Sequence, residues 1–162
     1  MSTSDLSAHI ASVGLVDHHT HGVWIETVSE ELFTFQMTES DRQPVSLESG
    51  MDAQLGFAIR AGCAPMLDLE PDVGAREYFE RRTELGGEEV NRRFLQASGI
   101  SHYLIDTGYR GTEIHSAEGM AALSGRPADR IVRLEATAEL VLQDGTTAAS
   151  FAEDFQIGRA HV

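Results

Sequence analysis

The segment Leu15-Val16-Asp17-His18-His19-Thr20-His21 begins with two apolar residues and ends in a cluster of histidines. Its start predicts a short buried strand over 15–17, which follows a helix that Gly14 closes. Further strands are expected at 101–106 and 131–135. Helical patterns cover 4–13, 30–35, 51–59, 75–82, 88–97, 117–123, 136–142 and 147–155. Because helices separate the strands and hairpin signals are missing, the sequence predicts an α/β fold with a parallel sheet, open or closed as a barrel.

The histidine cluster has the spacing of a metal site. Residues two apart on a strand point to the same side, so Asp17, His19 and His21 are expected to face one way. Two imidazoles about 6–7 Å apart along a strand can converge on one ion, and imidazole suits zinc, manganese or iron. Asp17 is expected one pleat deeper, where a carboxylate can orient a ligand imidazole or hold the end of the strand. The alternative is a set of histidines with a structural role only.

The same segment carries a family resemblance. The residues Leu15 to Val23 resemble the first-strand D-x-H-x-H signature of the amidohydrolase superfamily. Weaker similarities at 38–40, 57–60 and 98–109 indicate the amidohydrolase-related family, whose barrel domain is also found fused to glutamine-synthetase-like domains. The resemblance covers about residues 10 to 150. It implies a metal-dependent hydrolase acting on an amide or other C–N bond, with His19 and His21 as ligands of a divalent metal ion, zinc before manganese or iron.

The resemblance also implies that this sequence is a part of a larger fold. A (β/α)8 barrel needs about 250 residues, whereas this chain has 162. We therefore expect an N-terminal part of a TIM-type barrel, incomplete and with about three βα units. A catalytic zinc takes three protein ligands, so two histidines leave the active site of this fragment incomplete. The alternative is a small autonomous α/β binding or interaction module.

The end of the sequence is interpreted separately. Residues 157–162 break the preceding helical pattern without a capping residue, and they match the translation of a common sequencing adapter. The expected division is thus a partial barrel domain over 1–156 and a non-native tail over 157–162.

The charge of the chain limits its partners. It has 26 acidic residues against 12 basic ones, all of them arginine, and a net charge of −14. Such a surface repels phosphate backbones and anionic lipids, so we expect a small-molecule substrate rather than nucleic acid or membrane. A homo-oligomer of the full-length protein is left open. Cys63 is the only cysteine and the N-terminus has no secretory signal, which together favour the cytoplasm.

Three further residues are candidates for substrate contact or for support of the metal ligands. Asp106 and Glu135 are expected at the carboxyl ends of the second and third strands, the edge that carries the chemistry in barrels. Arg110 lies in the loop after Asp106 and could hold a substrate carboxylate through two hydrogen bonds. The alternative is that none of the three has a functional role: Asp106 caps the following turn, Glu135 caps or pairs locally, and Arg110 is exposed to solvent.

Overall fold

A computed structural model describes residues 3–38, 40–42, 44–143 and 146–160. Its elements in chain order are α1 (Thr3–Ser12), β1 (Leu15–Thr20), α2 (Glu30–Gln36), α3 (Leu47–Met51), α4 (Gln54–Cys63), the 3-10 helix η1 (Pro65–Leu67), α5 (Ala75–Leu85), α6 (Gly87–Ala97), β2 (Ile100–Asp106), α7 (Ala117–Ser124), β3 (Ala128–Ile131), α8 (Leu134–Gln143) and α9 (Phe151–Ala160).

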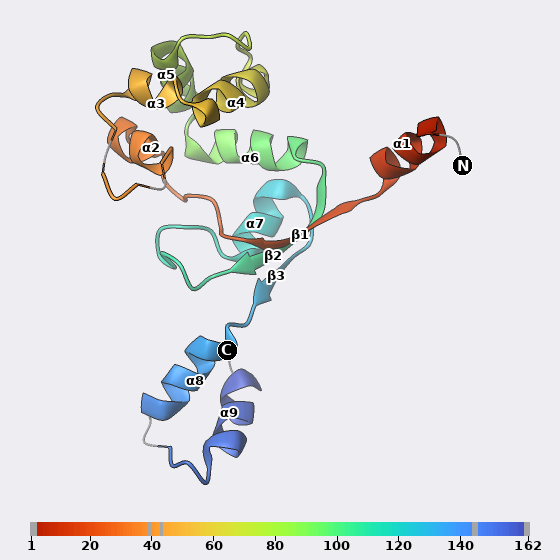
Figure 1. The fold of residues 1–162 in the computed structure, drawn as a ribbon, viewed down its shortest axis with the longest axis vertical. Helices are drawn as coiled ribbons and strands as arrows, with labels where there is room; N and C mark the ends of the chain where they lie inside the picture. Colours follow the sequence, from red (N-terminus) through yellow and green to blue (C-terminus); the bar gives the residue numbers. More distant parts are fainter. Residues whose placement is uncertain (1–2, 39, 43, 144–145, 161–162) are drawn as a thin grey trace.

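The three strands form one parallel sheet at the centre of the molecule (Figure 1). Their order is β1-β2-β3, so β2 is the middle strand. The pairing of β2 with β3 is regular, whereas the pairing of β1 with β2 shifts after Leu15 and again between Asp17 and Thr20. The parallel arrangement brings the carboxyl ends of all three strands to the same edge.

The helices between β1 and β2 build a core of their own. Serine caps define the starts of two of them: Ser29 accepts from Leu32 N, and Ser46 forms a capping box with Ser49. Figure 1 shows α3, α4 and α5 gathered together, with α6 between them and the sheet. Their apolar side chains meet in a cluster that is almost fully buried, with Leu47, Met51, Leu67, Tyr78 and Val90 at 2% exposure or less.

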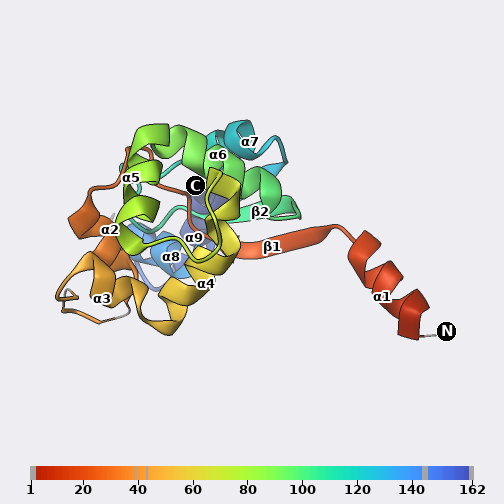
Figure 2. The same cartoon turned by 90° about the horizontal axis from the view of Figure 1, so that it is seen from above.

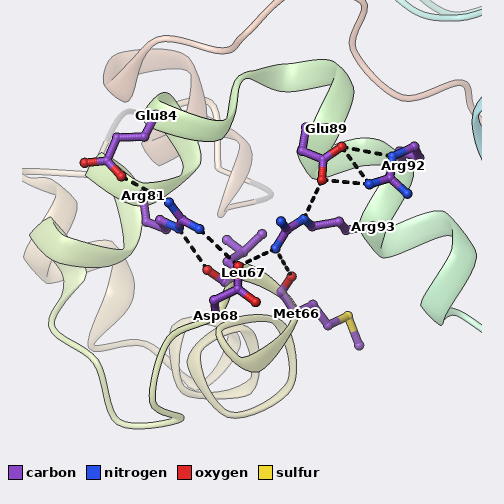
Figure 3. A network of polar contacts seen from close by, with 8 residues as sticks. All are labelled: Met66, Leu67, Asp68, Arg81, Glu84, Glu89, Arg92 and Arg93. Carbon is purple, nitrogen blue, oxygen red and sulfur yellow. Dashed lines mark hydrogen bonds and ion pairs between the residues drawn. The ribbon is translucent and has the colours of Figure 1, made fainter.

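A network of charged groups ties η1 to α5 and α6 (Figure 3). Asp68 ends η1 in the left-handed conformation, with φ of 64°. Its carboxylate accepts hydrogen bonds from Arg81 at 3.0 Å and Arg93 at 2.8 Å. The same two arginines donate to the carbonyls of Leu67 and Met66, which the short helix leaves unpaired at its end. One carboxylate therefore joins three consecutive helical elements.

A second core lies against the middle strand. Tyr103 and Ile105 of β2 pack with Met120 and Leu123 of α7, and Leu95 of α6 completes the cluster. Ser116 caps the start of α7, and Gly125 ends it with φ of 67°, a conformation that favours glycine. This packing fixes α7 beside β2 and β3.

The two ends of the chain project from this body. In Figures 1 and 2, α1 points away from the sheet, and its apolar residues Leu6 and Ile10 are exposed. The α8 and α9 helices pack on each other and extend away from the α3–α6 group in Figure 1. Within the described part of the chain, no helix combines the length and the apolar character that crossing a bilayer requires.

The expected N-terminal part of a (β/α)8 barrel is wrong. The described residues form a small α/β domain with an open three-stranded sheet, in which β1 has β2 as its only partner strand. Closing a barrel requires each edge strand to find a partner, and here Leu15 and Val16 on the edge strand are 54% and 56% exposed. A barrel also alternates single helices with strands, whereas the segment between β1 and β2 folds into several helices around a separate core.

Two local expectations near the C-terminus are also wrong. The third strand ends at Ile131, so Glu135 lies in the first turn of α8 and not at a strand end. The last helix runs from Phe151 to Ala160, so the helical pattern does not break at residue 157. The non-native origin of residues 157–162 stays a prediction, and residues 161 and 162 lie outside the described ranges.

Candidate metal centre

Three metal-ligating side chains converge at the carboxyl edge of the sheet. His19 lies near the end of β1, His21 follows that strand directly, and Asp106 is the last residue of β2. Each offers one ligand atom, and these atoms all lie within 4.8 Å of one another. The convergence follows from the topology, because neighbouring parallel strands end at the same edge. These residues could therefore hold a metal ion.

Asp106 is the buried member of the group. Its side chain is 8% exposed, and its Oδ1 accepts a hydrogen bond from Gly108 N at 2.8 Å. Its Oδ2 lies 3.4 Å from His19 Nε2, which is longer than a good charge-assisted hydrogen bond of about 2.7–2.9 Å. Ligand atoms that share a tetrahedral ion at about 2.1 Å lie about 3.4 Å apart. This pair thus has the separation of two ligands of one ion.

The ring of His21 is oriented by the backbone of β2. Its Nδ1 lies 3.0 Å from the carbonyl oxygen of Asp106. Because a carbonyl can only accept, this contact is a hydrogen bond when Nδ1 carries the proton, which leaves the lone pair on Nε2. Metal-binding histidines are commonly oriented in this way. The rings of His19 and His21 stand nearly perpendicular, with centroids 5.8 Å apart.

Asp17 contacts the backbone at the end of its own strand. Its Oδ1 accepts from the backbone N–H of His19 at 3.3 Å. The strand register is irregular between Asp17 and Thr20, so strict alternation fails there. Among the described residues, the group that could hold an ion includes Asp106 instead of Asp17. Asp17 therefore holds the backbone at His19, and its carboxylate has no contact with an imidazole among the described histidines.

Glu135 and Arg133 lie beside this edge as a pair. Arg133 donates to the Glu135 carboxylate at 2.9 Å. The pKa of Glu135 is lowered first by a backbone hydrogen bond at the start of α8 and then by Arg133. The pKa of Arg133 is raised first by Glu135 and then by the nearby charge of Asp106. A Cβ on Gly108 would lie 2.7 Å from the Arg133 side chain, so glycine permits this arginine to approach Asp106.

Arg110 is already engaged by neighbouring groups. Its guanidinium donates to Glu113 at 2.9 Å and to the Tyr109 hydroxyl at 2.9 Å. It also stacks over the Trp24 ring, 5.1 Å from the centroid. Carboxylate pairing and stacking thus engage the guanidinium that was named as a candidate for substrate contact.

Tyr109 is the residue near the site that the sequence did not indicate. Its ring lies 5.1 Å from the ring of His21. A tyrosine in a polar, glycine-containing loop is a common sequence pattern, so only the fold shows that this tyrosine lies beside His21. The other described histidines contribute nothing to the cluster: His18 is exposed, and His102 pairs with Asp129 at 2.7 Å.

Comparison with known proteins gives a likeness in fold. No protein-family model and no curated protein matches the sequence. Among solved structures, a crystal structure from Lactobacillus casei ATCC 334, described as a "putative metal-dependent hydrolase", is similar with a TM-score of 0.63 and 24% sequence identity. The likeness covers 93% of this chain and 39% of that protein. A fold similar to that of this chain thus occurs within a longer protein, of which the chain covers 39%.

Proposed function

We propose that the chain supplies a divalent-metal site to a metal-dependent hydrolase. The observation that carries this proposal is the convergence of His19, His21 and Asp106 within 4.8 Å at the carboxyl edge of the sheet. The description of the Lactobacillus protein supports the same class of activity for that longer protein. Two neutral nitrogen donors and one carboxylate form a donor set typical of hydrolytic metal sites.

Each residue has a definite part in this proposal. His19 and His21 would offer one nitrogen each, and Asp106 would offer a carboxylate oxygen that partly neutralises the charge of the ion. The Asp106 carbonyl fixes the ring of His21, and the Asp17 carboxylate fixes the backbone at His19. A bound divalent ion supplies an acidified water and polarises a substrate carbonyl. The His19 side chain is 56% exposed, so a substrate can approach from the solvent side.

The finer part of the proposal concerns the ion and the bond. Zinc is the preferred ion, with manganese and iron as alternatives, because imidazole suits zinc and iron and the Asp106 carboxylate suits manganese. The D-x-H-x-H resemblance favours an amide or another C–N bond in a small-molecule substrate. The net charge of −14 disfavours nucleic acid and anionic membrane as partners.

Metal titration of purified protein tests the site. We expect one ion of Zn²⁺ or Mn²⁺ to bind per chain by calorimetry. The variants His19→Ala, His21→Ala and Asp106→Asn should each lower the affinity for that ion by about tenfold or more. Even changes to residues that only support metal ligands have effects of this size. His18→Ala is the matched control, because His18 is an exposed histidine next to the cluster. Its binding should equal that of the unchanged protein.

The same variants separate the two classes of function. A melting temperature that rises with Zn²⁺ and falls with a chelator supports the metal site, since an ion that binds only the folded state stabilises it. Equal binding by all four variants, or a melting temperature indifferent to both additions, would instead favour a binding module with structural histidines.

A further inference from the structure

A second site lies on the helical side of the molecule, away from the histidine cluster. A cavity of about 100 Å³ opens between α2, the loop after β1, and the α5 and α6 helices. The side chains that the argument uses are Trp24, Glu26, Phe33, Arg82, Val90 and Asn91. His19, His21 and Asp106 do not line it. This cavity is therefore a separate feature.

Arg82 is the cation of this cavity. Its guanidinium lies over the ring of Phe33, 5.0 Å from the centroid, and over the ring of Phe94, at 5.7 Å. Stacking of this kind uses the faces of the guanidinium and leaves its N–H groups, which lie in the plane, free to donate. The two rings also hold the group in one orientation. Arg82 is thus a preoriented donor at the wall of a cavity.

No carboxylate neutralises this arginine within the described part of the chain. Its Nε is buried and has no hydrogen-bond partner there, and no ion pair includes Arg82. Other arginines do have carboxylate partners: Arg60, Arg76, Arg81, Arg92, Arg93, Arg110 and Arg133. Arg126 and Arg130 also have no ion pair among the described residues, so the feature that distinguishes Arg82 is its place between two aromatic rings on the wall of a cavity.

The polar neighbours of Arg82 are neutral groups. The Tyr78 hydroxyl and the Cys63 thiol lie close to it, and burial raises the pKa of both. Neither therefore supplies a negative charge near neutral pH. The half-buried guanidinium of Arg82 therefore has no negatively charged partner among the described residues.

We propose that this cavity binds the carboxylate of a small organic acid, with Arg82 as the bidentate donor. The planar fork of a guanidinium matches a carboxylate. The volume holds a small group and is below the roughly 300–1,000 Å³ of sites for drug-sized ligands. Trp24, Phe33 and Val90 offer apolar surface to a short tail. Glu26 also lines the cavity, and its negative charge disfavours a dianion such as phosphate more than a monocarboxylate.

The cavity contains its own reporter. Trp24 is the only tryptophan of the chain, and Asn91 donates to its carbonyl at 2.8 Å. We would titrate the full chain with sodium propionate and follow tryptophan fluorescence at constant ionic strength. Propionamide is the neutral isostere, and sodium chloride and inorganic phosphate are the ionic comparisons. A saturable change with propionate only is the expected result.

Matched arginine variants complete the test. Arg82→Gln should weaken propionate binding by about tenfold or more, the loss expected for a charged hydrogen-bonding group. Arg92→Gln should bind as the unchanged protein, because Arg92 pairs with Glu89 and does not line the cavity. If Arg82→Gln fails to fold by circular dichroism, Arg82→Lys decides, since it keeps the charge and loses the fork. Three results would overturn the proposal. The first is full propionate binding by Arg82→Gln, or by Arg82→Lys if Arg82→Gln does not fold. The others are a response to propionamide or phosphate equal to that to propionate, and no saturable response in the unchanged protein.

Discussion

Gly22 offers a sharp test of how the histidine segment is held. This glycine is buried and directly follows His21. A Cβ built on it would lie 1.9 Å from the carbonyl oxygen of His115. Real Cβ atoms essentially never come within 3.0 Å of another heavy atom, so Gly22→Ala must separate the two segments by more than about 1 Å.

The cost of this separation follows from the contacts it breaks. His115 N donates to the Val23 carbonyl at 2.8 Å, and Ile25 N donates to the Glu113 carbonyl at 3.0 Å. Each lost hydrogen bond costs about 1 kcal/mol, and overpacking adds about 1–3 kcal/mol. With both hydrogen bonds lost, we therefore expect Gly22→Ala to lower the free energy of unfolding by about 3–5 kcal/mol. Affinity for Zn²⁺ should also fall, because the displaced segment carries His21.

Urea unfolding measures this effect, and the chain provides a matched control. Gly62 lies in α4, and a Cβ added there would meet no atom within 4 Å. Gly62→Ala should be neutral or stabilising by up to about 1 kcal/mol, because alanine favours helix over glycine. With a slope of about 2 kcal/mol per molar urea, the middle of the usual range, the midpoint of Gly22→Ala should fall by about 1.5–2.5 M. Equal midpoints for Gly22→Ala and the unchanged protein would refute the close approach of these segments.

Two pH effects follow from the charged and buried groups. Hydrogen bonds from Arg93 and then Arg81 lower the pKa of Asp68 below 3.8. The ionised Asp68 therefore stabilises the folded state above pH 3.8, and this stabilisation is lost as the pH falls through the lowered pKa. Urea midpoints should decline less between pH 6 and pH 3 for Asp68→Asn than for the unchanged protein, and equal declines would contradict the network of Figure 3. Burial raises the pKa of Tyr78 to about 12, so the folded state keeps this proton while the unfolded state loses it above about 10, and stability should fall with pH in that interval. Absorbance of tyrosinate near 295 nm should show one late-titrating tyrosine that Tyr78→Phe removes; a titration unchanged by the substitution would contradict the buried hydroxyl.

Local patterns predicted much of the secondary structure. The helices expected at 75–82, 88–97 and 117–123 correspond to α5, α6 and α7, because apolar spacing and glycine stops act within a few residues. The third strand was predicted too late in the sequence. The composition of Ile131-Val132-Arg133-Leu134-Glu135 is typical of a strand, but β3 ends at Ile131 and α8 begins at Leu134. Short apolar runs are ambiguous in this way because tertiary contacts choose between strand and helix.

The barrel expectation failed for a related reason. Strand order and closure depend on which edges find partners, and this information is not local. The segment between β1 and β2 buries its apolar residues in a separate helical core around Met51, Leu67 and Tyr78. The sheet consequently stays open at β1 in the described residues.

The sequence by itself indicated His19 and His21 as candidate metal ligands and predicted a parallel sheet, because residue types, their spacing and the alternation of strands with helices can be read along the chain. Only the tertiary structure decided that Asp106, 85 residues after His21, is their partner, and that Asp17 instead serves the backbone. Likewise, only packing shows that Arg82 lies between two aromatic rings on a cavity wall, with no carboxylate partner among the described residues. The physical reason is the same in each case: side-chain chemistry is local, but pairing depends on which groups the fold brings within a few ångströms.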